Sequence, residues 1–108
     1  MDIMNVRQAK EWFEVLQTHK RAQTAMMTLA AGAATGSKAE AHRASDQILL
    51  VLEGRLSGSV GKKRPRLKKG DVIVIPAGVK HRFTNPGTKP AVTFNVYVPP
   101  AYPPQEKG

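Results

Sequence analysis

The sequence predicts a single all-β domain, and three features support this fold class. Runs of Val, Ile, Leu, Phe and Thr alternate with Gly and Pro about every ten residues, as in short strands joined by turns. A length of 108 residues suits one domain with a modest core. The chain has no cysteine, which excludes a disulfide framework and a thiolate metal site. We therefore expect one domain over residues 1–108.

Signals for a membrane or a secretory route are missing from the sequence. No apolar run approaches the length of a membrane span, and the start lacks the basic and apolar stretches of a signal peptide. We expect a cytoplasmic protein that makes no membrane contact.

The first candidate element, Trp12–Thr18, fits two kinds of secondary structure. Apolar residues between Val6 and Leu16 recur at helical spacing, whereas successive side chains within Trp12–Thr18 alternate as in a strand. We favour a strand, paired with a second strand at Ala22–Leu29 across the turn that begins at His19. The histidine in this turn is expected to be exposed rather than a ligand.

Six further strands follow along the chain, each bounded by turn residues. They are expected at Gln47–Leu52, Arg55–Val60, Arg64–Leu67, Asp71–Ile75, His81–Thr84 and Ala91–Val98. The segment 99–108 contains four prolines, which exclude a helix or a central strand. The core of the domain is therefore expected over about 12–98, followed by a proline-rich tail that runs extended over the surface and ends loosely.

The strand Gln47–Leu52 is apolar on both of its faces. Alternation puts Leu49 on one face and Ile48 on the other, and both faces continue with apolar residues. A half-buried strand needs only one such face. The second face must be covered by another sheet of the same chain or by another subunit, and we predict a homodimer.

The chain is strongly basic, with 17 Lys and Arg residues, 8 Asp and Glu residues and a net charge of +9. Such a charge raises nucleic acid or an acidic ligand as partners. The basic residues concentrate in Lys62–Lys69, between Gly61 and Gly70, which predicts a solvated hairpin and an edge strand. No aromatic residues interleave with these charges, as stacking on bases would need, so we do not expect nucleic acid as a partner.

The stretch Gly70–Asn85, GDVIVIPAGVKHRFTN, combines turn residues with one histidine. Pro76 ends a strand and forms a turn with Gly78, because Pro fixes φ and Gly permits a positive φ. In the strand that follows, His81 and Phe83 point to the same side. Phe83 belongs inside the fold, so His81 is expected to point inside too, as a satisfied core group or as a ligand.

The spacing in this stretch, G-x5-P-x-G-x2-H-x3-N, resembles the second conserved motif of the cupin family at every fixed position. Cupins are small jelly-roll β-barrels, so the resemblance implies this fold for most of the chain, roughly from Ala22 to Val98. In the metal-binding members, this motif supplies one histidine to a metal at the barrel mouth. The resemblance implies that role for His81.

The first cupin motif, G-x5-H-x-H-x3–4-E-x6-G, has a degraded counterpart here. Gly54 matches its end, and counting back places Gln47 in the slot of the glutamate. His42 then takes the slot of the second histidine, and Glu40 takes that of the first. Strand parity agrees with this register, since Glu40 and His42 would face the same way.

A rival register makes His42 the first histidine and places Ala44 in the slot of the second. It gains Gly36 at the correct offset, but it leaves two residues before Gln47, which is too short. We prefer the first register. The site that it implies consists of Glu40, His42, Gln47 and His81.

Two imidazoles and a carboxylate suit a divalent transition metal such as Fe, Mn, Ni, Cu or Zn. Glu40 would ligate this metal or act as a catalytic base, with His42 and His81 as further ligands. Gln47 is a neutral and weaker ligand than the glutamate of the family, so the affinity for metal should fall. In the alternative, these groups hydrogen-bond to one another and to water in a partly polar pocket.

Strand parity predicts more of the cavity wall. On the last strand, either the row of Phe94 or the row of Asn95 and Tyr97 points inward, and on the early strand the choice is between Met26 and Met27. These residues predict a small, largely apolar cavity with a few polar groups at one end, which is the usual form of a ligand site.

Two functions fit such a site. The first is a small metal-dependent cupin enzyme, oxygenase-like or isomerase-like, that acts on a small organic molecule. The alternative is a non-catalytic cupin that binds a small ligand, a sugar or an acidic metabolite, without metal. The fold does not choose between them, because it hosts many unrelated chemistries.

Overall fold

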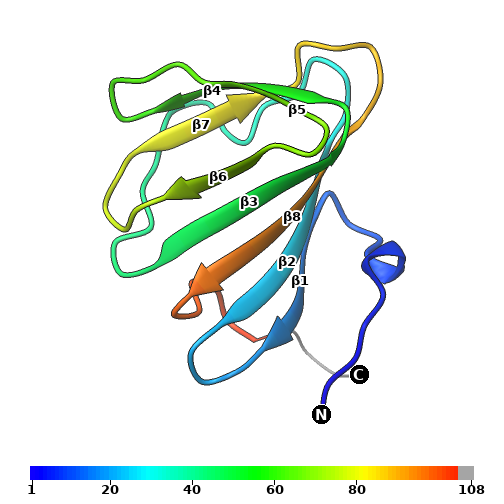
Figure 1. Ribbon diagram of the computed structural model, residues 1–108, viewed down its shortest axis with the longest axis vertical. Coiled ribbons are helices and arrows are strands. Elements are labelled where there is room, and N and C mark those ends of the chain that lie inside the picture. Colours follow the sequence, from blue (N-terminus) through cyan, green and yellow to red (C-terminus); the bar gives the residue numbers. More distant parts are fainter. Residues whose placement is uncertain (105–108) are drawn as a thin grey trace.

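The computed structural model describes residues 1–104, which form two antiparallel β-sheets. The strands are β1 (Phe13–Thr18), β2 (Gln23–Leu29), β3 (Asp46–Glu53), β4 (Arg55–Val60), β5 (Arg66–Lys68), β6 (Val72–Ile75), β7 (His81–Thr84) and β8 (Ala91–Val98), preceded by a short 3-10 turn, η1 (Val6–Gln8). In Figure 1 the smaller sheet crosses the top of the molecule and the larger sheet runs below it. The described chain contains no helix long and apolar enough to cross a membrane.

The strand order confirms the predicted jelly-roll fold. The larger sheet has five strands in the order β1-β2-β8-β3-β6, and the smaller has three in the order β5-β4-β7. Neighbouring strands come from distant parts of the chain, since β8 lies between β2 and β3. This wrapping brings segments from both ends of the sequence around one interior.

The ambiguous segment 12–18 is a strand, as predicted. β1 pairs antiparallel with β2, with Phe13 opposite Met27. Of the residues at helical spacing, those in Val6–Gln8 form the short η1. Pairing satisfies the backbone groups of β1 and buries Leu16, which is 2% exposed. His19, in the turn between the two strands, is exposed as expected.

The structure shows which alternate side chains of β8 and β2 point into the interior between the sheets. On β8 the row of Asn95 and Tyr97 is buried, and Phe94 points the other way. On β2, Met27 faces inward and Met26 faces outward, opposite Phe94. The core cluster consists of Met27, Leu29, Leu49, Val51, Leu56, Ile75, Phe83 and Ala91.

The outward face of β3 and β6 stays open. Leu49 is fully buried on the inner face of β3, whereas Ile48 is 37% exposed and Val72 and Val74 are each 59% exposed. Ile48 lies opposite Val74, so the apolar surface is continuous across the two strands. Within residues 1–104, no second sheet covers this face at Ile48, Val72 and Val74, which is against the alternative of a cover from the same chain. The homodimer stays a prediction.

The basic stretch forms the edge of the smaller sheet, as predicted. Val60 and Lys63 close the hairpin through two backbone hydrogen bonds of 2.9 and 3.0 Å. β5 is an outer strand that pairs with β4 on one side. It begins at Arg66 rather than at the predicted Arg64, because Pro65 has no N–H to donate to the ladder.

The proline-rich tail was expected to run extended over the surface, and as far as the described chain extends it is held by hydrogen bonds to β2. Gln23 of β2 is 1% exposed, and its Oε1 accepts hydrogen bonds from the backbone N–H groups of Ala101 (3.1 Å) and Tyr102 (3.0 Å). Its Nε2 donates to the carbonyl oxygen of Tyr102 at 2.9 Å. Residues 105–108 of the expected tail lie outside the described range.

Candidate functional site

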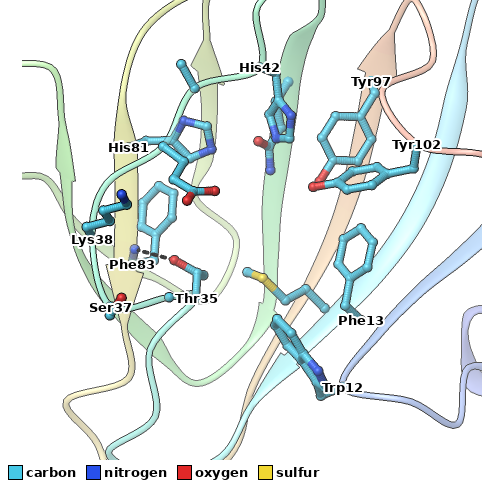
Figure 2. A pocket seen from close by; sticks show the side chains of 15 residues that line it. Trp12, Phe13, Thr35, Ser37, Lys38, His42, His81, Phe83, Tyr97 and Tyr102 are labelled. Atoms are coloured by element: carbon cyan, nitrogen blue, oxygen red, sulfur yellow. Dashed lines mark hydrogen bonds between the residues drawn. The ribbon is translucent and has the colours of Figure 1, made fainter.

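A cavity of about 610 Å³ opens between the two sheets, and side chains from several distant segments line it. Figure 2 shows the ring of His42 between that of His81 and the hydroxyl-bearing rings of Tyr97 and Tyr102. All four residues of the predicted site, Glu40, His42, Gln47 and His81, line this one cavity. The structure thus brings both motifs together, while their roles as ligands or base stay predictions.

His81 begins β7 and pairs with Glu40 on the neighbouring loop. The backbone N–H of each residue donates to the carbonyl of the other, at 2.9 and 3.1 Å, so the two side chains are directly opposed and point the same way. Nδ1 of the His81 ring lies 3.0 Å from the carbonyl oxygen of Val79. Because a carbonyl only accepts, Nδ1 carries the proton, and Nε2 is the nitrogen left for the cavity.

His42 lies on the loop before β3 and is tied to the turn of the second motif. Its carbonyl oxygen accepts a hydrogen bond of 2.7 Å from the N–H of Gly78. The carboxylate of Asp46 strengthens this connection by accepting a 2.8 Å bond from the N–H of Ala77. These two hydrogen bonds explain how motifs more than thirty residues apart arrive at one site.

Aromatic rings surround the His42 imidazole. Its centroid lies 5.3 Å from that of His81 and 5.1 Å from that of Tyr97, to which it is edge-on. Burial lowers the pKa of His42, and the neighbouring His81 lowers it further. His42 is therefore a neutral imidazole at pH 7, able to accept a hydrogen bond or to ligate a metal.

Gln47 lies on the inner face of β3, deep in the cavity. It is 4% exposed, and its Nε2 donates a 2.9 Å hydrogen bond to Oδ1 of Asn95 on β8. Its Oε1 is buried and has no hydrogen-bond partner within residues 1–104. The residue in the glutamate slot thus lines the cavity and carries a buried, neutral acceptor.

Tyr102 belongs to the site although its sequence position suggested a surface tail. Its ring lies 4.8 Å from Phe13, 5.5 Å from His42 and 5.2 Å from Tyr97. Burial raises the pKa values of Tyr97 and Tyr102, whose phenol groups hydrogen-bond to each other. The one sequence feature that could have found it is an aromatic residue between two Pro-Pro pairs, where the chain is stiff.

The residues present fit a metal ion only in part. Among residues 1–104, no group of three His, Cys, Asp or Glu side chains is arranged to hold a metal. The nearby donors are the imidazoles of His42 and His81 and the amide oxygen of Gln47, a neutral set that binds metals less tightly than one with a carboxylate. Glu40 also lines the cavity, with an exposed side chain, and does not complete such a group of three.

Comparisons with known proteins agree on the type of domain. A family profile described as "Cupin domain" matches residues 25–97. The uncharacterized protein YrkC of Bacillus subtilis is 33% identical over 94 residues, which cover 82% of this chain and 50% of that protein. The auxin-binding protein ABP19b of Prunus persica is 35% identical over 65 residues, covering 56% of this chain and 31% of that protein. The chain thus spans half or less of these curated relatives.

Solved structures give the same fold over nearly the whole chain. A protein from Bacillus halodurans superposes with a TM-score of 0.85 at 27% identity, covering 94% of this chain and 80% of that one. A protein from Thermus thermophilus superposes with a TM-score of 0.80 at 25% identity, covering 92% of this chain and 98% of that one.

Proposed function

This chain belongs to the cupin family, and from that premise we propose that it binds a small organic molecule with a flat apolar body. The observation that carries the proposal is the cavity itself. A space of about 610 Å³ with aromatic walls and a few inward polar groups has the size and lining of a small-molecule site. A relative named as an auxin-binding protein supports a binding role.

The walls of the cavity favour a flat ligand. Phe13, Phe83, Tyr97 and Tyr102 contribute rings from four separate segments. Aromatic rings pack against other flat groups through offset-stacked and edge-to-face contacts. Several rings around one space therefore suit a planar ligand, with its polar groups turned toward Gln47 or toward the rim.

The test is an NMR titration of 15N-labelled, EDTA-treated protein with phenol and with glucose. We expect saturable shifts of the amides of His81 and Phe83 with phenol. Ala41→Trp fills the cavity from its loop and should abolish them, whereas Ala44→Trp, on an exposed part of the same loop, should not. Binding of glucose but not phenol, or phenol binding that Ala41→Trp leaves unchanged, would contradict the proposal.

A second candidate function is that of a metal-dependent enzyme, oxygenase-like or isomerase-like. The observation that favours it is the hydrogen bond from Nδ1 of His81 to the carbonyl of Val79, because metal-bound histidines are usually oriented through their other nitrogen in this way. His42, His81 and Gln47 would hold the metal, and Glu40 would act as ligand or base. A bound metal would polarise an oxygen of the substrate.

Elemental analysis of the untagged protein tests the second candidate. Near-stoichiometric Fe, Mn, Ni, Cu or Zn in the wild type, lost in the His42→Ala/His81→Ala double variant, is the expected result. Metal absent from both proteins after incubation with salts of all five would reject this function and leave the ligand-binding proposal standing.

A further inference from the structure

We infer that the ligand of this cavity places an uncharged hydrogen-bond donor, an O–H or N–H group, against Oε1 of Gln47. This inference rests on the proposed function and adds the chemical class of the ligand. The ligand would have a flat apolar body and one neutral donor at its inner end. Phenols and N–H heterocycles are of this class.

A chain of three hydrogen bonds sets the direction of the Gln47 amide. Thr93 has one hydroxyl proton, which it donates to the carbonyl oxygen of Met27 at 3.1 Å. The Thr93 oxygen therefore accepts from Nδ2 of Asn95 at 3.0 Å, and this turns Oδ1 of Asn95 toward Gln47. Nε2 of Gln47 donates to that oxygen at 2.9 Å. Oε1 is thus the end of the amide that this chain of hydrogen bonds leaves without a partner.

The free end of this amide is a buried acceptor without a donor in the part of the chain described. Gln47 lines the cavity and is 4% exposed, and its Oε1 has no hydrogen-bond partner there. Leaving a buried carbonyl oxygen unsatisfied is destabilising, so such groups nearly always have a partner. A ligand that packs against this oxygen therefore binds well only if it brings a donor of its own.

The surroundings of Oε1 favour a donor without charge. The buried polar side chains of residues 1–104 are all Gln, Ser, Asn or Thr, and none of them carries a charge. A cation at Oε1 would lose its hydration with no buried counter-charge, and a carboxylate would set its oxygens against another acceptor. The charged residues that line the cavity, Lys38 and Glu40, are exposed.

A matched pair of probes isolates the donor. Phenol and anisole share one ring, but phenol donates a hydrogen bond and anisole cannot. Anisole is the more apolar of the two and would bind better in a cavity selective for apolar bulk alone. We therefore propose titrating EDTA-treated wild-type protein, Gln47→Met and the control Gln17→Met, a change outside the cavity, with phenol, anisole and benzoate, by calorimetry or NMR.

We expect the wild type and Gln17→Met to bind phenol about tenfold more tightly than anisole, the effect of one buried hydrogen bond, and benzoate more weakly than phenol. In Gln47→Met this preference for phenol should vanish. A second readout needs no variant: the 13Cδ resonance of Gln47 in the wild type should move with phenol and stay in place with anisole.

The outcomes separate the inference from the proposed function. Equal or tighter binding of anisole, a preference unchanged in Gln47→Met, or a 13Cδ resonance insensitive to phenol overturns the inference and leaves the cavity a site for flat molecules. Failure of all three probes to bind rejects the proposed function, and the inference falls with it.

Discussion

We expect protonation of His42 to make the stability of the fold depend on pH. Burial lowers its pKa, so the folded chain binds a proton at this ring less readily than the unfolded chain does. The unfolded state then takes up the proton first as the pH falls below about 6.5, and stability decreases with falling pH in that range. Above this range, the contribution of His42 is independent of pH.

Two measurements on metal-free protein check this prediction. NMR titration of the His42 ring should give a midpoint below 6.5, and urea unfolding between pH 5 and pH 8 should show stability falling toward acid. The titratable groups packed around this ring are His81, Tyr97 and Tyr102. His42→Phe is the control, and an equal slope in that variant would contradict our assignment.

Gly54 is the position of the first motif at which the backbone requires glycine. Its φ is +77°, and a Cβ there would lie 2.6 Å from the carbonyl oxygen of Pro90 and 2.9 Å from Cα of Ala91. Both contacts are with backbone, which cannot move aside as a flexible side chain can. We expect Gly54→Ala to lower the free energy of unfolding by about 3 kcal/mol, from backbone strain and overpacking together.

Gly70 provides the matched control for Gly54. Its φ is +91°, but a Cβ there meets nothing within 4 Å. Gly70→Ala should therefore cost about 1 kcal/mol, the backbone term alone. Urea unfolding measures both variants, and equal losses would show that the close approach of the 90–91 backbone is unimportant.

At the scale of elements, β2 and the tail act together. Gln23 binds the backbone of Ala101 and Tyr102 through three hydrogen bonds, which place the Tyr102 ring in the cavity. In Gln23→Met these tail groups lose their partners, and we expect a loss of about 2 kcal/mol in stability. Hydrogen exchange at the Ala101 and Tyr102 amides should be at least tenfold faster.

Gln17→Met is the control for the tail. Gln17 bonds to Asp2 and Thr24 rather than to the tail, so this variant should leave exchange at Ala101 and Tyr102 unchanged. Equal protection of the two amides in Gln23→Met and in the wild type would mean that the tail is held by ring packing instead.

At the scale of the whole molecule, charge is unevenly distributed. The chain carries +9, yet none of its 17 Lys and Arg residues lies in the five strands of the larger sheet. β4, β5 and β7 of the smaller sheet carry Arg55, Arg66, Lys68 and Arg82. The outward face of β3 and β6 is therefore the place where two copies can meet without bringing basic residues of those strands together.

We expect a second copy of the chain to cover this face, as the two apolar sides of β3 suggest. Val74 is 59% exposed at its centre, so Val74→Lys should convert a dimer to a monomer by burying unpaired charge. Ser59→Lys, on β4 of the smaller sheet, should leave the dimer intact. Sedimentation velocity measures both, and a wild type that stays monomeric at high micromolar concentration would refute the prediction.

Local pattern was sufficient for most of the fold. The strand ends predicted from glycine and proline lie close to those in the structure. These residues act on the backbone of their own turn, so their effect can be predicted locally. The segment 12–18 was harder, since its helical and strand patterns overlap, and pairing with β2 decided between them. The boundary at Pro65 shifted by two residues, because the ladder needs N–H groups that proline lacks.

The sequence by itself determined the fold family and placed Glu40, His42, Gln47 and His81 around one cavity. Motif spacing marked these residues through the resemblance to cupins, and hydrogen bonds from the turn at Ala77 and Gly78 to Asp46 and His42 hold the two motifs together in the fold. Tertiary structure alone decided the direction of the Gln47 amide and the entry of Tyr102. Both depend on side-chain partners far away in the sequence, and such contacts follow from packing rather than from periodicity.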